Sequence, residues 1–132
     1  MIDPVNLLGL PYRLGADPEQ HGAADCLSLS RHVVGEHGVT MPPAKRDWYR
    51  RLRRKDYSVF REELNKWGYE INEPRIGSIV LCKTDRGYAL GAYWYGGCLV
   101  FVNTEVSWQP VTNLQVEAFY FPLRQNCATP LA

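Results

Sequence analysis

The feature that most constrains the fold is a change of hydrophobic period near Gly68. Before it, apolar residues recur at helical spacing; after it, short runs rich in aromatic and β-branched residues alternate with turn residues. Helical spacing predicts amphipathic helices, whereas short alternating runs predict strands. Helices followed by strands predict the α+β class. At 132 residues, the chain has the length of about one domain.

The first half predicts four helical segments. Residues 3–9 predict a short helix, and a longer one begins after Asp25, a candidate N-cap. Residues 45–55 and 58–67 predict two further helices. We expect the buried face of the last one to carry Val59, Phe60, Leu64 and Trp67.

The second half predicts an antiparallel meander or small open barrel packed on the helices. The strand-like runs are residues 69–72, 77–83, 88–95, 99–103 and 117–123. Turn residues at 85–87 and 95–97 separate neighbouring runs. We expect one domain over residues 1–124 and a loose tail over 125–132.

Composition narrows the classes of partner. The formal net charge is +1, which argues against nucleic acid as the main partner. No apolar run has the roughly 18–20 residues of a membrane span, and the start lacks the features of a secretory signal. We therefore expect synthesis in the cytoplasm without export through a signal peptide.

The cysteines do not predict a metal site. Cys26, Cys82, Cys98 and Cys127 are far apart in sequence and form no C-x-x-C pair, so we expect neither zinc nor another cofactor. Cys82 and Cys98 fall within apolar runs and are expected to be buried thiols.

Cys26 has a different setting, because it opens the helix that follows Asp25. A thiol at a helix N-terminus is close to the positive end of the helix dipole, which favours the nucleophilic thiolate. A cysteine hydrolase would place its nucleophile there. However, no histidine follows His37, so the usual base is missing from the C-terminal two-thirds of the chain.

An ordered set of motifs over residues 8–104 resembles the NlpC-type cell-wall cysteine peptidases, a compact branch of the papain-like fold. LPYRLG at 10–15 is similar to the family's approach loop G-x-P-Y-x-W-G-G, and DCLSL at 25–29 to its nucleophile helix D-C-S-G-L. GEHGVTMP at 35–42 is similar to x-x-G-I-x-L-P, PRIGSIVL at 74–81 to P-G-D-L-V-L-F, and ALGAY at 89–93 to H-V-G-I-Y.

The resemblance implies hydrolysis of peptide bonds in peptidoglycan stems. It makes Cys26 the nucleophile and places Tyr12 on the side of the oxyanion. Asp25 and Ser28 would receive the amino end of the substrate. Asn103 falls at the third polar position, which orients the base histidine.

The chain departs from the family at the base itself, where the resemblance places Ala89. A positioned general base contributes about 10² to 10⁴-fold to rate. The helix terminus offers only about 0.3–1 kcal/mol, too little to ionise an ordinary thiol at neutral pH. Cys26 is therefore expected to be a vestigial nucleophile. His21, in the loop before the helix, is the candidate for a replacement base.

Residues 46–55 (RDWYRRLRRK) form a strongly basic run with three open interpretations. It could contact phosphate backbones, or it could contact an acidic neighbouring subunit. The interpretation favoured by the pattern is a solvated helix face with Trp48, Tyr49 and Leu52 packed inward.

Small NlpC-like domains of this style resemble those encoded in the tail gene clusters of tailed phages. The resemblance implies a structural component of a phage tail tip or baseplate, located in the virion, with peptidase activity lost or vestigial. Its partners would be other tail or baseplate subunits, with peptidoglycan as a further partner. The alternatives are an active peptidoglycan endopeptidase or amidase with Cys26 as nucleophile, and a nucleic-acid or partner-binding module that uses residues 46–55.

Overall fold

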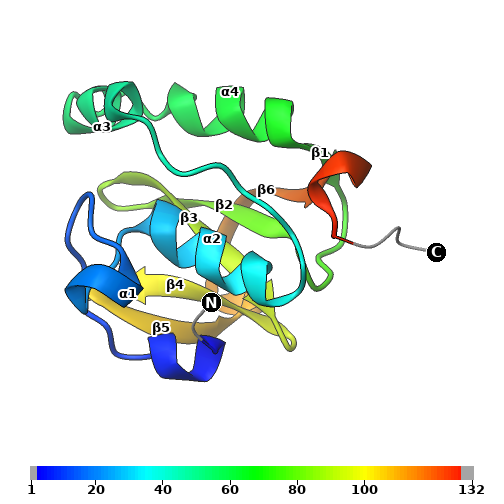
Figure 1. The fold of residues 1–132 in the computed structure, drawn as a ribbon, viewed down its shortest axis with the longest axis horizontal. Helices are drawn as coiled ribbons and strands as arrows, with labels where there is room; N and C mark the ends of the chain where they lie inside the picture. Colours follow the sequence, from blue (N-terminus) through cyan, green and yellow to red (C-terminus); the bar gives the residue numbers. More distant parts are fainter. Residues whose placement is uncertain (1–2, 129–132) are drawn as a thin grey trace.

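The computed structural model describes residues 3–128 and has helices on one side of an antiparallel sheet (Figure 1). The helical elements are the 3₁₀ turn η1 (Pro4–Leu7), α1 (Pro18–His21), α2 (Cys26–Glu36), α3 (Arg46–Arg53) and α4 (Ser58–Trp67). The strands are β1 (Gly68–Ile71), β2 (Ile79–Thr84), β3 (Gly87–Trp94), β4 (Gly97–Val102), β5 (Glu105–Pro110) and β6 (Gln115–Pro122). The predicted α+β class is confirmed.

The order of the strands differs from the predicted meander. The described residues form a six-stranded sheet in the order β1-β6-β2-β3-β4-β5, and the sheet does not close into a barrel. Strands β2 to β5 follow one another as a meander, but β6 returns to lie between β1 and β2. A sequence pattern predicts strands one at a time, whereas this insertion is a long-range pairing.

Strand β5 was absent from the predicted strands. Its neighbour β4 is mostly buried, whereas in β5 only Val106 is buried, at 3% exposure. The remaining positions include Glu105, Ser107 and Gln109, which are poor strand formers or polar. A strand with one buried side chain lacks the apolar alternation on which the prediction depends.

Helix α2 packs directly on the sheet and contacts β3 and β4. Helices α3 and α4 follow one another in a second layer at the top of Figure 1, connected to α2 by an extended segment. The main core fills the space between helices and sheet and includes Leu29, Val33, Leu81, Leu90 and Leu99. The predicted buried face of α4 is confirmed by Val59, Phe60, Leu64 and Trp67.

A smaller core lies on the other face of the sheet. It contains Val80, Cys82, Cys98, Val100 and Phe119. Neighbours in sequence along a strand point to opposite faces, so Leu81 and Val80 belong to different cores. Both cysteines here are free and buried, as predicted.

The end of the chain is tied to the domain further than expected. Residues Arg124–Asn126 form the 3₁₀ turn η3, and the side-chain amide of Asn126 donates to the carbonyl of Trp67 at 2.7 Å. The backbone amide of Ala128 donates to the carbonyl of Gly38 at 2.7 Å. Residues 125–128 of the expected loose tail thus bond back to the domain, and residues 129–132 lie outside the described part. Between residues 3 and 128, no helix combines the length and the apolarity needed to cross a bilayer.

Candidate functional site

Asp25 fixes the start of α2 through a capping box. One carboxylate oxygen accepts the backbone amide of Ser28 at 2.8 Å, and the Ser28 hydroxyl lies 3.1 Å from the backbone amide of Asp25 and accepts from it. The second carboxylate oxygen accepts the backbone amide of Gly15 at 2.8 Å. The Ser28 hydroxyl also donates to the carbonyl of Ala16 at 2.7 Å. These bonds join the approach loop to α2, and the predicted N-cap is confirmed.

The Cys26 thiol lies at the junction of α2 and β3. The residue keeps some contact with solvent but packs against the main core. Burial is the main reason why the pKa of this thiol is raised to about 12, and the Asp25 carboxylate raises it further. Backbone amides of Leu90, Cys26 and Leu27 lower the pKa of the thiol, but their effect is smaller than that of burial. The helix dipole therefore does not activate the sulfur here.

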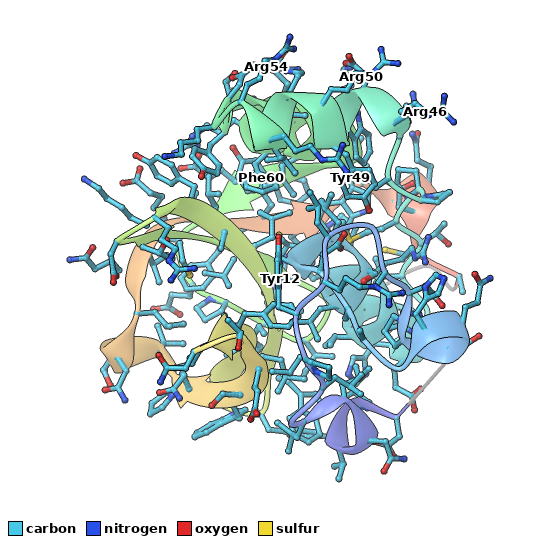
Figure 2. The ribbon with its side chains drawn as sticks, turned by 90° about the vertical axis from the view of Figure 1, so that its left-hand side faces the viewer. Tyr12, Arg46, Tyr49, Arg50, Arg54 and Phe60 are labelled. Atoms are coloured by element: carbon cyan, nitrogen blue, oxygen red, sulfur yellow. The ribbon has the colours of Figure 1, made fainter. Side chains whose placement is uncertain are left out.

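Tyrosine hydroxyls gather around this thiol. Tyr12 is 44% exposed, and its ring packs edge-on against Phe101 with the centroids 5.1 Å apart. In the view of Figure 2, its side chain lies near the middle of the picture and points up toward Phe60 and Tyr49. Burial, Cys26 and Asp25, in that order, raise the pKa of Tyr12 to about 12. Tyr12 thus lies near the thiol as a neutral hydroxyl.

Tyr49 also belongs to the site, although the sequence did not predict it as a site residue. Burial is the main reason why the pKa of its hydroxyl is raised, and the nearby Asp25 carboxylate raises it further. Its place in the basic run suggested only inward packing, which is confirmed, because the ring packs against the main core. The proximity to Asp25 has no local sequence signal, since the two residues are 24 positions apart.

The side chain of Ala89 does not face Cys26. Ala89 lies opposite Cys82 in the pairing of β2 with β3, and Cys82 belongs to the smaller core on the far face of the sheet. Leu90, the next residue, points into the main core beneath α2, and its backbone amide acts on the sulfur. In this fold, a histidine at position 89 would therefore point away from the thiol.

The histidines near the helical half bond elsewhere. His21 is exposed in α1, and its Nδ1 accepts the backbone amide of Asp17 at 2.9 Å. His32 is 2% exposed, with its Nε2 3.1 Å from the Asp17 carboxylate. It lies six residues beyond Cys26, a rise of about 9 Å along the helix. His37 caps the other end of α2.

Asn103 occupies the turn between β4 and β5. Its φ is 50° and that of Thr104 is 68°, two consecutive left-handed residues. This is the backbone of a tight hairpin, in which asparagine is favoured. The turn is exposed, so the local geometry gives Asn103 a turn-forming role.

A groove of about 500 Å³ lies between the approach loop and α3. We call it the arginine groove; its lining residues are Leu14, Gly15, Arg46, Tyr49, Arg50 and Arg53. Gly15 bonds to Asp25 and the Tyr49 hydroxyl lies near that carboxylate, so the groove adjoins the N-terminus of α2. Within residues 3–128, no cluster of three or more His, Cys, Asp or Glu side chains has the arrangement of a metal site.

Comparisons with known proteins add no relative. No protein-family model matches the chain, and no curated protein matches it either.

Proposed function

We propose that this chain is an NlpC-type, papain-like domain that keeps the scaffold of a cysteine peptidase without its turnover. We further propose that it serves as a structural component of a phage tail tip or baseplate. The observation that carries the first part is the surroundings of the Cys26 sulfur. It lies among core side chains, a carboxylate and tyrosine hydroxyls, with Leu90 of β3 beside it.

The thiol is poorly suited to attack a carbonyl. With a pKa of about 12, about one Cys26 in 10⁵ is ionised at pH 7, against roughly 3 in 100 for an ordinary thiol. The Asp25 carboxylate opposes ionisation, because a second negative charge beside it is unfavourable. A histidine base beside the sulfur would favour the thiolate and offset the charge of Asp25. However, His21 and His32 both bond to Asp17.

The residues expected to receive substrate are engaged in the fold. Asp25 is 1% exposed and Ser28 is 7% exposed. Both carboxylate oxygens of Asp25 accept backbone amides, and the Ser28 hydroxyl bonds to Ala16. A substrate amine could reach them only by breaking these bonds. This supports a structural role for both residues.

The assignment to a phage tail depends on the sequence resemblance. A domain with a formed core and an unreactive thiol is consistent with a structural subunit. Its partners would be other tail or baseplate subunits. Mass spectrometry of virions from a phage that encodes this chain should detect it in the tail fraction. Its absence from the virions would contradict this part of the proposal.

Thiol reactivity tests the loss of turnover. In a Cys127→Ser background, we expect iodoacetamide to alkylate Cys26 at pH 7 at least 100-fold more slowly than N-acetylcysteine. The rate should keep rising up to pH 10 and above, with the modified residue located by mass spectrometry. Cys82 and Cys98 are buried, so they should stay unmodified as long as the chain remains folded during the reaction.

Two results would overturn the proposal. One is an alkylation rate that is already maximal below pH 7, the behaviour of an activated nucleophile. The other is cleavage of peptidoglycan stem peptides that Cys26→Ala abolishes. Either result would establish the alternative, an active endopeptidase or amidase. A further His21→Ala substitution would then show whether that histidine is the base.

A further inference from the structure

The positive charge of this chain is concentrated on one helix. Residues 45–55 contain seven basic residues and one acidic residue, whereas the other 121 residues contain eight basic and thirteen acidic residues. The near-neutral total thus combines a strongly basic segment with an acidic remainder. Figure 2 shows Arg46, Arg50 and Arg54 projecting along the outer border of α3.

The arginines of the groove have no partner within the described part of the chain. Arg51, which is not part of the groove, bonds to Asp56, Ser58 and Glu62. No carboxylate of residues 3–128 forms an ion pair with Arg46, Arg50 or Arg53, which are exposed. Three unpaired guanidinium groups along one groove form a site for negative charge.

The spacing of these arginines defines the shape of a matching ligand. Arg46, Arg50 and Arg53 lie at i, i+4 and i+7 and form one stripe on α3. At 1.5 Å per residue, the stripe extends about 10 Å, with steps of about 6 and 4.5 Å. Alternate residues of an extended peptide are about 6.6–6.8 Å apart. An extended segment with acidic side chains at every second position matches the first step closely, and the long arginine side chains can span the difference of about 2 Å at the second step.

We propose that the arginine groove binds an extended acidic segment of a partner protein, in which aspartate or glutamate occupies alternate positions. Each guanidinium would hold a carboxylate through paired N–H donors. The volume of about 500 Å³ is in the range of a site for a few residues. Cys26 does not line the groove, so binding of an acidic peptide there does not depend on whether the thiol is catalytically active.

Two observations favour a peptide over a nucleic acid. Single-stranded nucleic acids stack their bases on exposed aromatic rings. In α3, however, Trp48 is 7% exposed, and Tyr49 packs against the core with its hydroxyl near Asp25. In addition, the acidic remainder of the chain repels a long polyanion, whereas a short acidic segment needs only the local match.

Fluorescence anisotropy with a labelled peptide tests the inference. The probe is an extended peptide of alternating glycine and aspartate, and the matched control peptide carries asparagine in place of aspartate. We expect the aspartate peptide to bind at 25 mM NaCl and to bind at least tenfold more weakly at 200 mM. The asparagine peptide should bind at least tenfold more weakly than the aspartate peptide.

Charge reversal locates the site. The double variant Arg46→Glu/Arg50→Glu should bind the aspartate peptide at least tenfold more weakly. The control with the same change of net charge is Lys83→Glu/Arg86→Glu, because both residues are exposed and lie at the end of β2 and in the turn that follows, outside the groove. We expect its affinity to stay within twofold of wild type. If the double variant does not fold, Arg46→Gln/Arg50→Gln takes its place and should lose at least fivefold.

Three outcomes would overturn the inference. The first is no binding of the aspartate peptide to the wild-type chain. The second is an equal loss of affinity in Lys83→Glu/Arg86→Glu, which would indicate a response to net charge alone. The third is tighter binding of a twelve-residue oligothymidine than of the peptide, which would make a phosphate polymer the ligand.

Discussion

Replacement of Asp25 by alanine separates a structural role from a substrate-binding role. In the wild-type chain this carboxylate accepts amides from Ser28 and Gly15, both at 2.8 Å. Alanine removes both acceptors at once. It also removes the carboxylate that lies near the Tyr49 hydroxyl. The approach loop and α2 then lose their main polar connection.

The expected loss is about 2–3 kcal/mol of unfolding free energy. Loss of an N-cap aspartate typically costs about 1 kcal/mol. An amide that loses its acceptor costs about 1–3 kcal/mol, and the lower value applies to Gly15, since this residue is exposed and water can replace the carboxylate. For a domain of this size, the combined loss lowers the melting temperature by about 6–15 °C.

Urea unfolding followed by tryptophan fluorescence measures this loss. The matched control is Asp3→Ala, because Asp3 also caps a helical turn but does so through one bond, 3.0 Å to Val5, at an exposed position. We expect this control to lose less than about 1 kcal/mol. Asp25→Asn keeps one acceptor oxygen and should fall between wild type and Asp25→Ala.

An equal or higher urea midpoint for Asp25→Ala would refute the reasoning. It would mean that the buried carboxylate opposes folding and has to be kept for another purpose, such as substrate binding. The reactivity of Cys26 provides a second, independent test of the role of Asp25. Because the Asp25 carboxylate raises the pKa of Cys26, Asp25→Asn should increase the alkylation rate of that thiol at pH 8.

Three further perturbations test the fold. Gly91→Ala should lower stability by more than about 2 kcal/mol, since its Cβ would lie 2.6 Å from the carbonyl oxygen of Leu99 in the neighbouring strand. Arg51→Gln should destabilise the chain at pH 6. This difference should shrink between pH 4 and 2, because the hydrogen bond from Arg51 lowers the pKa of Asp56 to about 2, and its contribution is lost as the pH falls through that value. His32→Leu should cost about 1–3 kcal/mol, since it removes a buried bond to a carboxylate. Thermal and urea unfolding measure all three.

Each of these perturbations has a control within the chain. Gly96→Ala meets no atom within 4 Å, so only its positive φ of 82° opposes the change, and the cost should be about 1 kcal/mol. Arg86→Gln should leave the acid dependence of stability unchanged. His21→Ala, at an exposed position, should cost less than His32→Leu. A reversal of any of these orders contradicts the corresponding argument.

The features that the sequence predicted well are local ones. Asp25 as an N-cap depends on residues three positions apart, and the buried face of α4 depends on spacing within ten residues. Both interactions are complete within one element. Their signal therefore lies in a short stretch of sequence, and the structure contains them at the predicted places.

The features that could not be predicted depend on distant partners. The place of β6 between β1 and β2 is set by contacts across the whole second half of the chain. The direction of Ala89 follows from its register with Cys82, which a motif alignment does not contain. Likewise, the Cys26 thiol is next to a helix start in sequence, but burial against the core outweighs the dipole. The missing base already predicted a protonated thiol, whereas its burial, which raises the pKa further, depends on tertiary packing and has no local signal.

The approach loop also protects one border of the sheet. Gly9 donates its amide to Val106, Val106 donates to Leu10, and Tyr12 donates to Thr104, so the loop fills the outer hydrogen bonds at the start of β5. Without this segment, β5 would be a bare edge with free donors and acceptors, which invites strand addition from other copies. A variant that lacks residues 1–12 is therefore expected to aggregate, because this segment covers an edge of the sheet that could otherwise pair with other copies.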